Sequence, residues 1–253
     1  TFLIFYFIFK LKIPTDIQSH TYILATFLIH GYFPNPPLYY FSIYIVNIFT
    51  QNNFINASVI VLTLASVSKI ILVVKYLKTE NKIIQSQVFN FLAFTLMFIS
   101  PIYIFFIDKN TWYLGKFTST IWHNSTIIFV FPFCIWLFLE SLKYLKKPGL
   151  FSLLKMLIIS ILILLAKPSF LFAFIVAFPF ICLYEFGLFN KWFFYVAFIC
   201  LLILCALFFQ KNLIYHNSEL DKLIYNDEKS KIIIAPFKVW LAWSKYPISN
   251  FLT

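Results

Sequence analysis

Continuous apolar runs of about 20 residues recur along this 253-residue chain, and they constrain its fold more than any other feature. A helical run of that length matches the ~30 Å hydrocarbon core of a bilayer. Only 11% of the residues are charged, whereas a soluble domain has about a quarter. The runs also lack the apolar–polar alternation of a membrane β-barrel. The sequence therefore predicts an all-α, polytopic transmembrane helical bundle.

The apolar runs divide the chain into about seven expected spans and one shorter segment. The expected spans are residues 1–13, 54–74, 87–107, 125–142, 150–166, 169–187 and 192–209. Residues 38–49 are too short to cross and follow three prolines, so they predict a re-entrant or interfacial helix. Residues 1–253 are expected to form a single transmembrane domain. Both ends break off within apolar sequence, which suggests a fragment of a longer protein.

The basic residues predict the orientation of the spans. All 20 are lysines, and the net charge is +11. Lysines accumulate in cytoplasmic loops, which places residues 75–82, 143–149 and 190–191 inside. The segments then expected outside are residues 14–53, 108–124, 167–169 and 210–235. This pattern is typical of a multi-pass protein of the plasma or inner cell membrane. No nucleic-acid-binding module is present, so no nucleic-acid partner is expected.

One expected outer loop, residues 107–124, is far longer than a connection between two spans requires. Long loops on a rigid scaffold often carry function. Its polar and aromatic residues are therefore candidate site residues: Asp108, Trp112, Lys116, Trp122, His123 and Asn124. The alternative is an interfacial belt, because Trp and Tyr gather at the level of lipid headgroups. Asp108 beside Lys109 is also explained by a solvated pair at the membrane boundary.

A second outer group begins at Asp16. Asp16 and His20 are four residues apart, so a helix places both on one face. Asp16 is a candidate general base, with His20 as its partner, or alternatively a helix N-cap. With His123, these two residues also form the candidate set for a divalent cation, although their spacing matches no metal signature. No other cofactor is expected.

Lys167 stands between two apolar runs, where a charge is costly unless it snorkels or meets a partner. It is therefore either a ligand for an anionic headgroup or a marker of the interface. Because the chain contains no Arg, phosphate recognition must rely on Lys or on backbone amides.

Two sequence motifs at the start of the chain resemble the C-type (GT-C) membrane glycosyltransferases. They are Asp16 just beyond the first span, followed by a helix ending in His30-Gly31, and the segment Phe33-Pro34-Asn35-Pro36-Pro37-Leu38-Tyr39-Tyr40. The chain is also similar to a group of bacterial multi-pass membrane proteins. That likeness is carried by Tyr113-Leu114-Gly115, Trp122-His123-Asn124, Lys167-Pro168-Ser169-Phe170 and Ala235-Pro236-Phe237-Lys238-Val239-Trp240. The chain departs from the GT-C pattern in having no Asp-Asp or Asp-Glu pair after the first span.

The resemblance implies sugar transfer on the outer face of the membrane, from a polyprenyl-phosphate-linked donor to a glycan or lipid acceptor. Asp16 would be the catalytic aspartate and Asp108 the second acidic residue. Lys167, Lys116 or His123 would face the phosphate that leaves, with Asn124 beside them. Four aromatic residues are candidates for stacking on sugars: Tyr39, Tyr40, Trp112 and Trp122. A transporter or lipid-carrier flippase is the alternative, followed by a structural membrane subunit.

Overall fold

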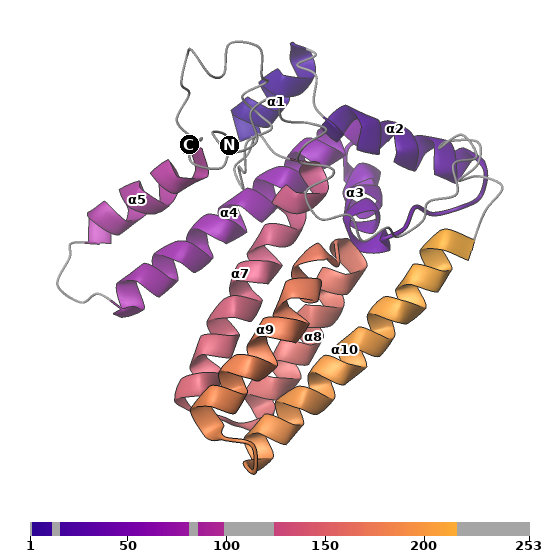
Figure 1. Cartoon of the computed structure of the whole chain (residues 1–253). Coiled ribbons are helices and arrows are strands. Elements are labelled where there is room, and N and C mark those ends of the chain that lie inside the picture. Colours follow the sequence, from indigo (N-terminus) through magenta and orange to yellow (C-terminus); the bar gives the residue numbers. More distant parts are fainter. Residues whose placement is uncertain (1, 12–15, 81–85, 99–123, 217–253) are drawn as a thin grey trace, which may run out of the picture.

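A computed structural model describes residues 2–11, 16–80, 86–98 and 124–216, and all regular structure within these ranges is helical (Figure 1). The helices are α1 (Phe2–Lys10), α2 (Asp16–Ile29), α3 (Pro37–Phe49), α4 (Phe54–Glu80), α5 (Ser86–Phe98), α7 (Ser125–Lys146), α8 (Leu150–Ala166), α9 (Ser169–Phe186) and α10 (Lys191–His216). The predicted all-α class is therefore confirmed for the described residues.

Four of these helices are long and apolar enough to cross a membrane, namely α4, α7, α9 and α10. Helices α3 and α8 are apolar but shorter. The predicted count of about seven spans is thus shown only in part, and residues 99–107 of one expected span lie outside the described residues. Helix α3 has 13 residues, about 20 Å at 1.5 Å per residue. It is therefore shorter than a bilayer core, as its sequence predicted.

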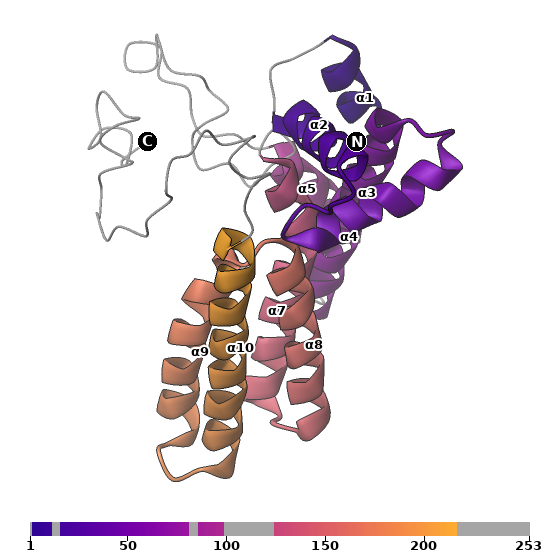
Figure 2. The ribbon, with the colours of Figure 1, turned by 90° about the vertical axis from the view of Figure 1, so that its right-hand side faces the viewer.

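Helices α7 to α10 run side by side as an elongated bundle, and α1, α2 and α3 gather at one end of it (Figures 1 and 2). Helix α4 packs along α7, and α5 packs on α4. The buried apolar side chains of α1 to α4 and of α7 to α10 form one contiguous cluster. Its centre includes Leu62 of α4, Leu137 of α7 and Ile163 of α8, none of which is exposed.

The outer surface of the bundle is itself apolar. Phe180 of α9 and Phe208 of α10 are 67% and 60% exposed, and many other large apolar side chains are exposed as well. A soluble protein rarely exposes so much contiguous apolar surface. With four helices of spanning length, this surface indicates a membrane protein.

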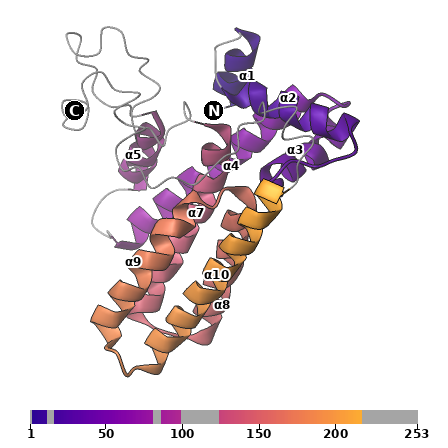
Figure 3. The same cartoon turned by 45° about the vertical axis from the view of Figure 1, so that its right-hand side comes forward.

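The connections group at the two ends of the bundle. The α7–α8 and α9–α10 turns lie at one end, and the α8–α9 connection lies at the other, near α2 and α3 (Figure 3). Lys143, Lys146, Lys147 and Lys191 are at the first end. Successive connections therefore lie at alternating ends of the bundle, and the lysine-based orientation depends on this alternation.

Thiol labelling tests the orientation. In Ser19→Cys, on the exposed side of α2, the cysteine should react with an impermeant reagent applied to intact cells. In Phe189→Cys, in the α9–α10 turn, it should react only after the membrane is opened, because Phe189 is 93% exposed but at the opposite end. The unmodified chain is the control for labelling of the native cysteines, of which Cys134, Cys182 and Cys200 are buried and Cys205 is exposed. Outside labelling of Phe189→Cys would reverse the orientation.

Candidate functional site

Five of the predicted site residues have described side chains, and all lie toward the end of the bundle where α2 and α3 are. They are His20, Tyr39, Tyr40, Asn124 and Lys167. Asp16 is the first residue of α2, one helical turn before His20, as the spacing predicted. The other predicted site residues lie outside the described residues: Asp108, Trp112, Lys116, Trp122 and His123.

His20 joins α2 to α3. Its Nδ1 lies 2.7 Å from the hydroxyl oxygen of Tyr40, a hydrogen bond between residues 20 apart in the sequence. The rings of His20 and Tyr39 meet edge to face, with the ring centres 5.9 Å apart. Tyr39 is fully buried and Tyr40 is 5% exposed. Both tyrosine rings are therefore covered by protein in this arrangement, and their predicted role in stacking on sugars stays a prediction.

Lys167 forms the second group, where the α8–α9 connection meets the start of α7. Its ammonium donates to the hydroxyl oxygen of Thr126 at 3.0 Å and lies 3.4 Å from Oδ1 of Asn124. Asn124 is the N-cap of α7, because its Oδ1 accepts from the backbone N–H of Thr126 at 3.0 Å. The Thr126 hydroxyl also donates to this oxygen. The cap thus positions both polar side chains beside the lysine.

An aromatic contact connects the two groups. The ring of Tyr39 packs on Phe129 of α7, with the centres 5.3 Å apart. Phe129 lies one turn after Ser125, which begins α7 next to the cap. A shared set of buried side chains therefore holds α2, α3 and the start of α7 in fixed relation.

A pocket of about 680 Å³ opens at the same end, between α2, α3 and the last turn of α8. Its walls are mostly apolar and aromatic: Leu28, Tyr32, Phe33, Phe41, Tyr44 and Leu165. Leu165 is two residues before Lys167 in the sequence, and Lys167 itself is not among the residues that line the pocket. Apolar walls of this kind suit the apolar part of a ligand.

The described residues show no metal site. Among the described residues, no group of three or more His, Cys, Asp or Glu side chains could hold a metal ion. The candidate cation set included His123, which lies outside the described residues. A divalent cation therefore stays a prediction.

Comparison with known proteins adds no relative. No protein-family model matches the chain, and neither a curated protein nor a solved structure matches it significantly.

Two residues of the site, Thr126 and Phe129, were not predicted from the sequence. The signal for Thr126 was present, because Asn124-Ser125-Thr126 directly before an apolar run is a strong N-cap pattern. For Phe129 no sequence signal exists in a chain with 35 phenylalanines. Its importance comes only from the packing of α7 against α3.

Proposed function

We propose that the chain is a membrane glycosyltransferase that transfers a sugar from a lipid-phosphate-linked donor on the outer face of the membrane. The observation that carries the proposal is the position of the Lys167 ammonium, 3.0 Å from Thr126 at the start of α7. The GT-C-like residues around Asp16 lie on α2 and α3, at the same end of the bundle.

The Lys167 group has the chemistry of an anion site. The N-terminus of α7 carries a partial positive charge, and the lysine adds a full one. Lys167 is half-buried, so a phosphate here would be less screened than in water. In a sugar transfer from a lipid phosphate, negative charge develops on the phosphate that leaves. A cation held in place by Thr126 and Asn124 would stabilise that charge without rearranging.

The lipid tail of the donor has a matching environment. The apolar pocket at this end contains Leu165 of α8, which precedes Lys167 by two residues. We assign the isoprenoid chain to this pocket and the phosphate to the ammonium group. The acceptor would then approach from α2, where Asp16 begins the helix and His20 is held by Tyr40. In this arrangement Asp16 removes the acceptor proton as a general base.

Lys167→Gln tests the phosphate site. Its hydrogen bond to a phosphate would be charge-assisted, which typically contributes about 1.5–3 kcal/mol. Donor affinity should therefore fall by about 10–100-fold. The variant should still fold, since the Asn124 cap of α7 is retained. The measurement is equilibrium binding of a polyprenyl-phosphate sugar to purified protein in nanodiscs.

The matched control is Lys155→Gln, the same change within helix α8, of which Lys167 is the C-cap. Lys155 lies over the ring of Phe151, 4.3 Å from its centre, toward the other end of the helix. Donor binding should be unchanged in this variant. Equal binding by Lys167→Gln and wild type would remove Lys167 from the site and leave it as an interfacial lysine.

A lipid-carrier flippase is the second candidate, since it would use the same ligand chemistry. One observation favours it, because Lys69 of α4 lies well inside a candidate span. Its ammonium lies over the ring of Phe131 in α7, 4.5 Å from the ring centre. Ionisable residues at such depth often mark transport pathways. An aromatic ring also stabilises a buried cation in place, which explains Lys69 without transport.

A further inference from the structure

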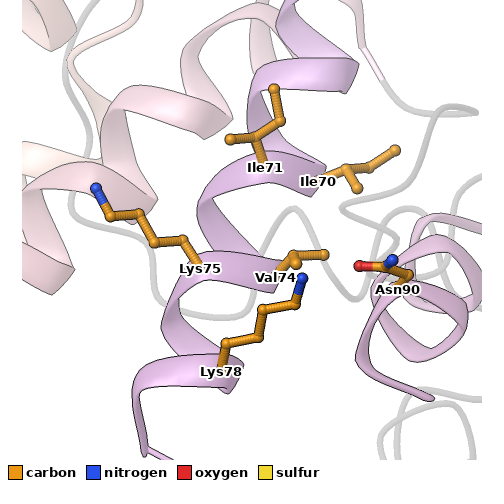
Figure 4. Close-up of a pocket in the computed structure, with 6 residues that line it drawn as sticks. All are labelled: Ile70, Ile71, Val74, Lys75, Lys78 and Asn90. Atoms are coloured by element: carbon orange, nitrogen blue, oxygen red, sulfur yellow. The ribbon is translucent and has the colours of Figure 1, made fainter. Parts of the chain in front are cut away.

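A second pocket, of about 510 Å³, lies between α4 and α5, away from the candidate active site. We propose that it binds an anionic phospholipid, of the phosphatidylglycerol type, by its headgroup and the start of one acyl chain. Its six lining residues are Ile70, Ile71, Val74, Lys75 and Lys78 of α4 and Asn90 of α5 (Figure 4).

Along α4 the lining residues change from apolar to basic, as a phospholipid changes from acyl chain to phosphate. Ile71, Lys75 and Lys78 are spaced i, i+4 and i+7, so they lie along one face. Ile70 and Val74 run beside them, also four residues apart. The apolar side chains are toward the middle of the span, and the two lysines are at its end, because the apolar span of α4 ends at Lys78. The acyl chain of a phospholipid would therefore lie on the apolar side chains, and its phosphate would lie at the lysines.

The polar groups converge from two helices. In Figure 4 the Lys78 ammonium and the Asn90 amide point toward the same space beside Val74, and the Lys75 side chain extends to the left, away from Asn90. Lys78 supplies a charge and Asn90 supplies an amide donor for a phosphate or glycerol oxygen. Lys75 adds a second positive charge at the rim. No acidic residue is among the lining residues, so the pocket favours an anion.

The apolar wall distinguishes a lipid from free phosphate. Ile71 is 59% exposed, and it lies on the same face of α4 as the lysines, one helical turn before Lys75. A water-soluble phosphate would leave this wall uncovered, whereas the acyl chain of a membrane lipid covers it. Lysine-lined pockets at the cytoplasmic end of membrane helices are where anionic headgroups bind. The lysine-based orientation places this end of α4 in the cytoplasmic leaflet.

Photocrosslinking in nanodiscs locates the lipid. The whole chain is placed in phosphatidylcholine that contains a minor fraction of diazirine-labelled phosphatidylglycerol, and crosslinked peptides are identified by mass spectrometry. Crosslinks are expected on the α4 and α5 peptides that contain residues 70–78 and 90. In Lys75→Gln/Lys78→Gln they should fall by about fivefold for each lysine removed. Asn90→Leu alone should lower them by a few-fold, because it removes one hydrogen-bonding group.

Lys146→Gln/Lys147→Gln is the matched control, with the same charge loss at the end of α7. It should leave the α4 and α5 crosslinks unchanged. Equal crosslinking by diazirine-labelled phosphatidylcholine, or no loss in Lys75→Gln/Lys78→Gln and Asn90→Leu, would overturn the proposal. Displacement of the lipid by inorganic phosphate would also overturn it, because the pocket would then be a soluble-phosphate site. None of these results depends on whether the chain transfers sugar.

Discussion

Asp16→Asn is expected to lower the rate of sugar transfer by about 10²–10⁴-fold, the usual cost of losing a general base. The amide is nearly isosteric with the carboxylate but cannot accept a proton at neutral pH. Asp16 begins α2, and its position is compatible with a helix-capping role as well. The substitution separates the two roles, since Asn caps a helix as well as Asp does. Folding should therefore be retained while turnover is lost.

The measurement for Asp16→Asn is glycan product formed by purified protein at matched concentration, with the thermal midpoint recorded beside it. Asp16→Ala is the companion variant, because it removes both the base and the cap. It should lose turnover and also lower the stability of α2 by about 1 kcal/mol. Normal turnover by Asp16→Asn would show that Asp16 is only a cap, and the proposed mechanism would lose its base.

Tyr39→Ala is expected to destabilise the protein by about 3–5 kcal/mol, the range for removing a large buried aromatic ring. Tyr39 is fully buried and contacts His20 of α2, Tyr40 of α3 and Phe129 of α7. The cavity would loosen three helices at the end where the candidate site lies. Unfolding in detergent should therefore begin at a clearly lower temperature, and transfer activity should fall with it.

Tyr22→Ala is the matched control for this second prediction. Tyr22 lies on α2, two residues after His20, and is 73% exposed. The same atoms are removed, but no cavity forms, so the stability should change by less than about 0.5 kcal/mol. Equal destabilisation by the two substitutions would show that the aromatic contacts of Tyr39 do not hold this end of the bundle together.

In the described part of the chain, the bounds of a helix were predicted well where turn residues lie on both sides of an apolar run. Helix α8 begins and ends at the predicted residues, because Gly149 precedes it and Lys167-Pro168 follows it. Helices α4 and α10 continue past their predicted ends, to Glu80 and His216. A change from apolar to polar residues marks where a span leaves the membrane, but a helix continues as long as its backbone hydrogen bonds do.

A contact with another helix also supports the continuation of α10 past residue 209. The side-chain amide of Gln210 donates to the carbonyl oxygen of Leu164, at 2.8 Å, where α8 is close to its end. This bond satisfies a carbonyl at a helix C-terminus and holds the two helices together. No sequence pattern links residues that are 46 positions apart, so this extension was not predictable.

The candidate site residues were chosen from the sequence and their role stays a prediction, whereas the contacts between them could not be predicted. Both His20 and Tyr40 were candidates, yet their hydrogen bond depends on how α2 packs against α3. Lys167 and Asn124 are 43 residues apart and meet only because α8 ends where α7 begins. Side-chain chemistry and helical spacing are local properties of a sequence, whereas the pairing of helix ends is set by packing of the whole bundle.

The most direct test of the central claim is the fate of a polyprenyl-phosphate sugar, labelled in both parts, when the wild-type chain is reconstituted in vesicles. The glycosyltransferase account predicts that the sugar label moves to an acceptor, the polyprenyl phosphate remains as product, and Lys167→Gln slows this transfer. A sugar that crosses the bilayer still attached to its lipid would contradict the account and identify a flippase instead.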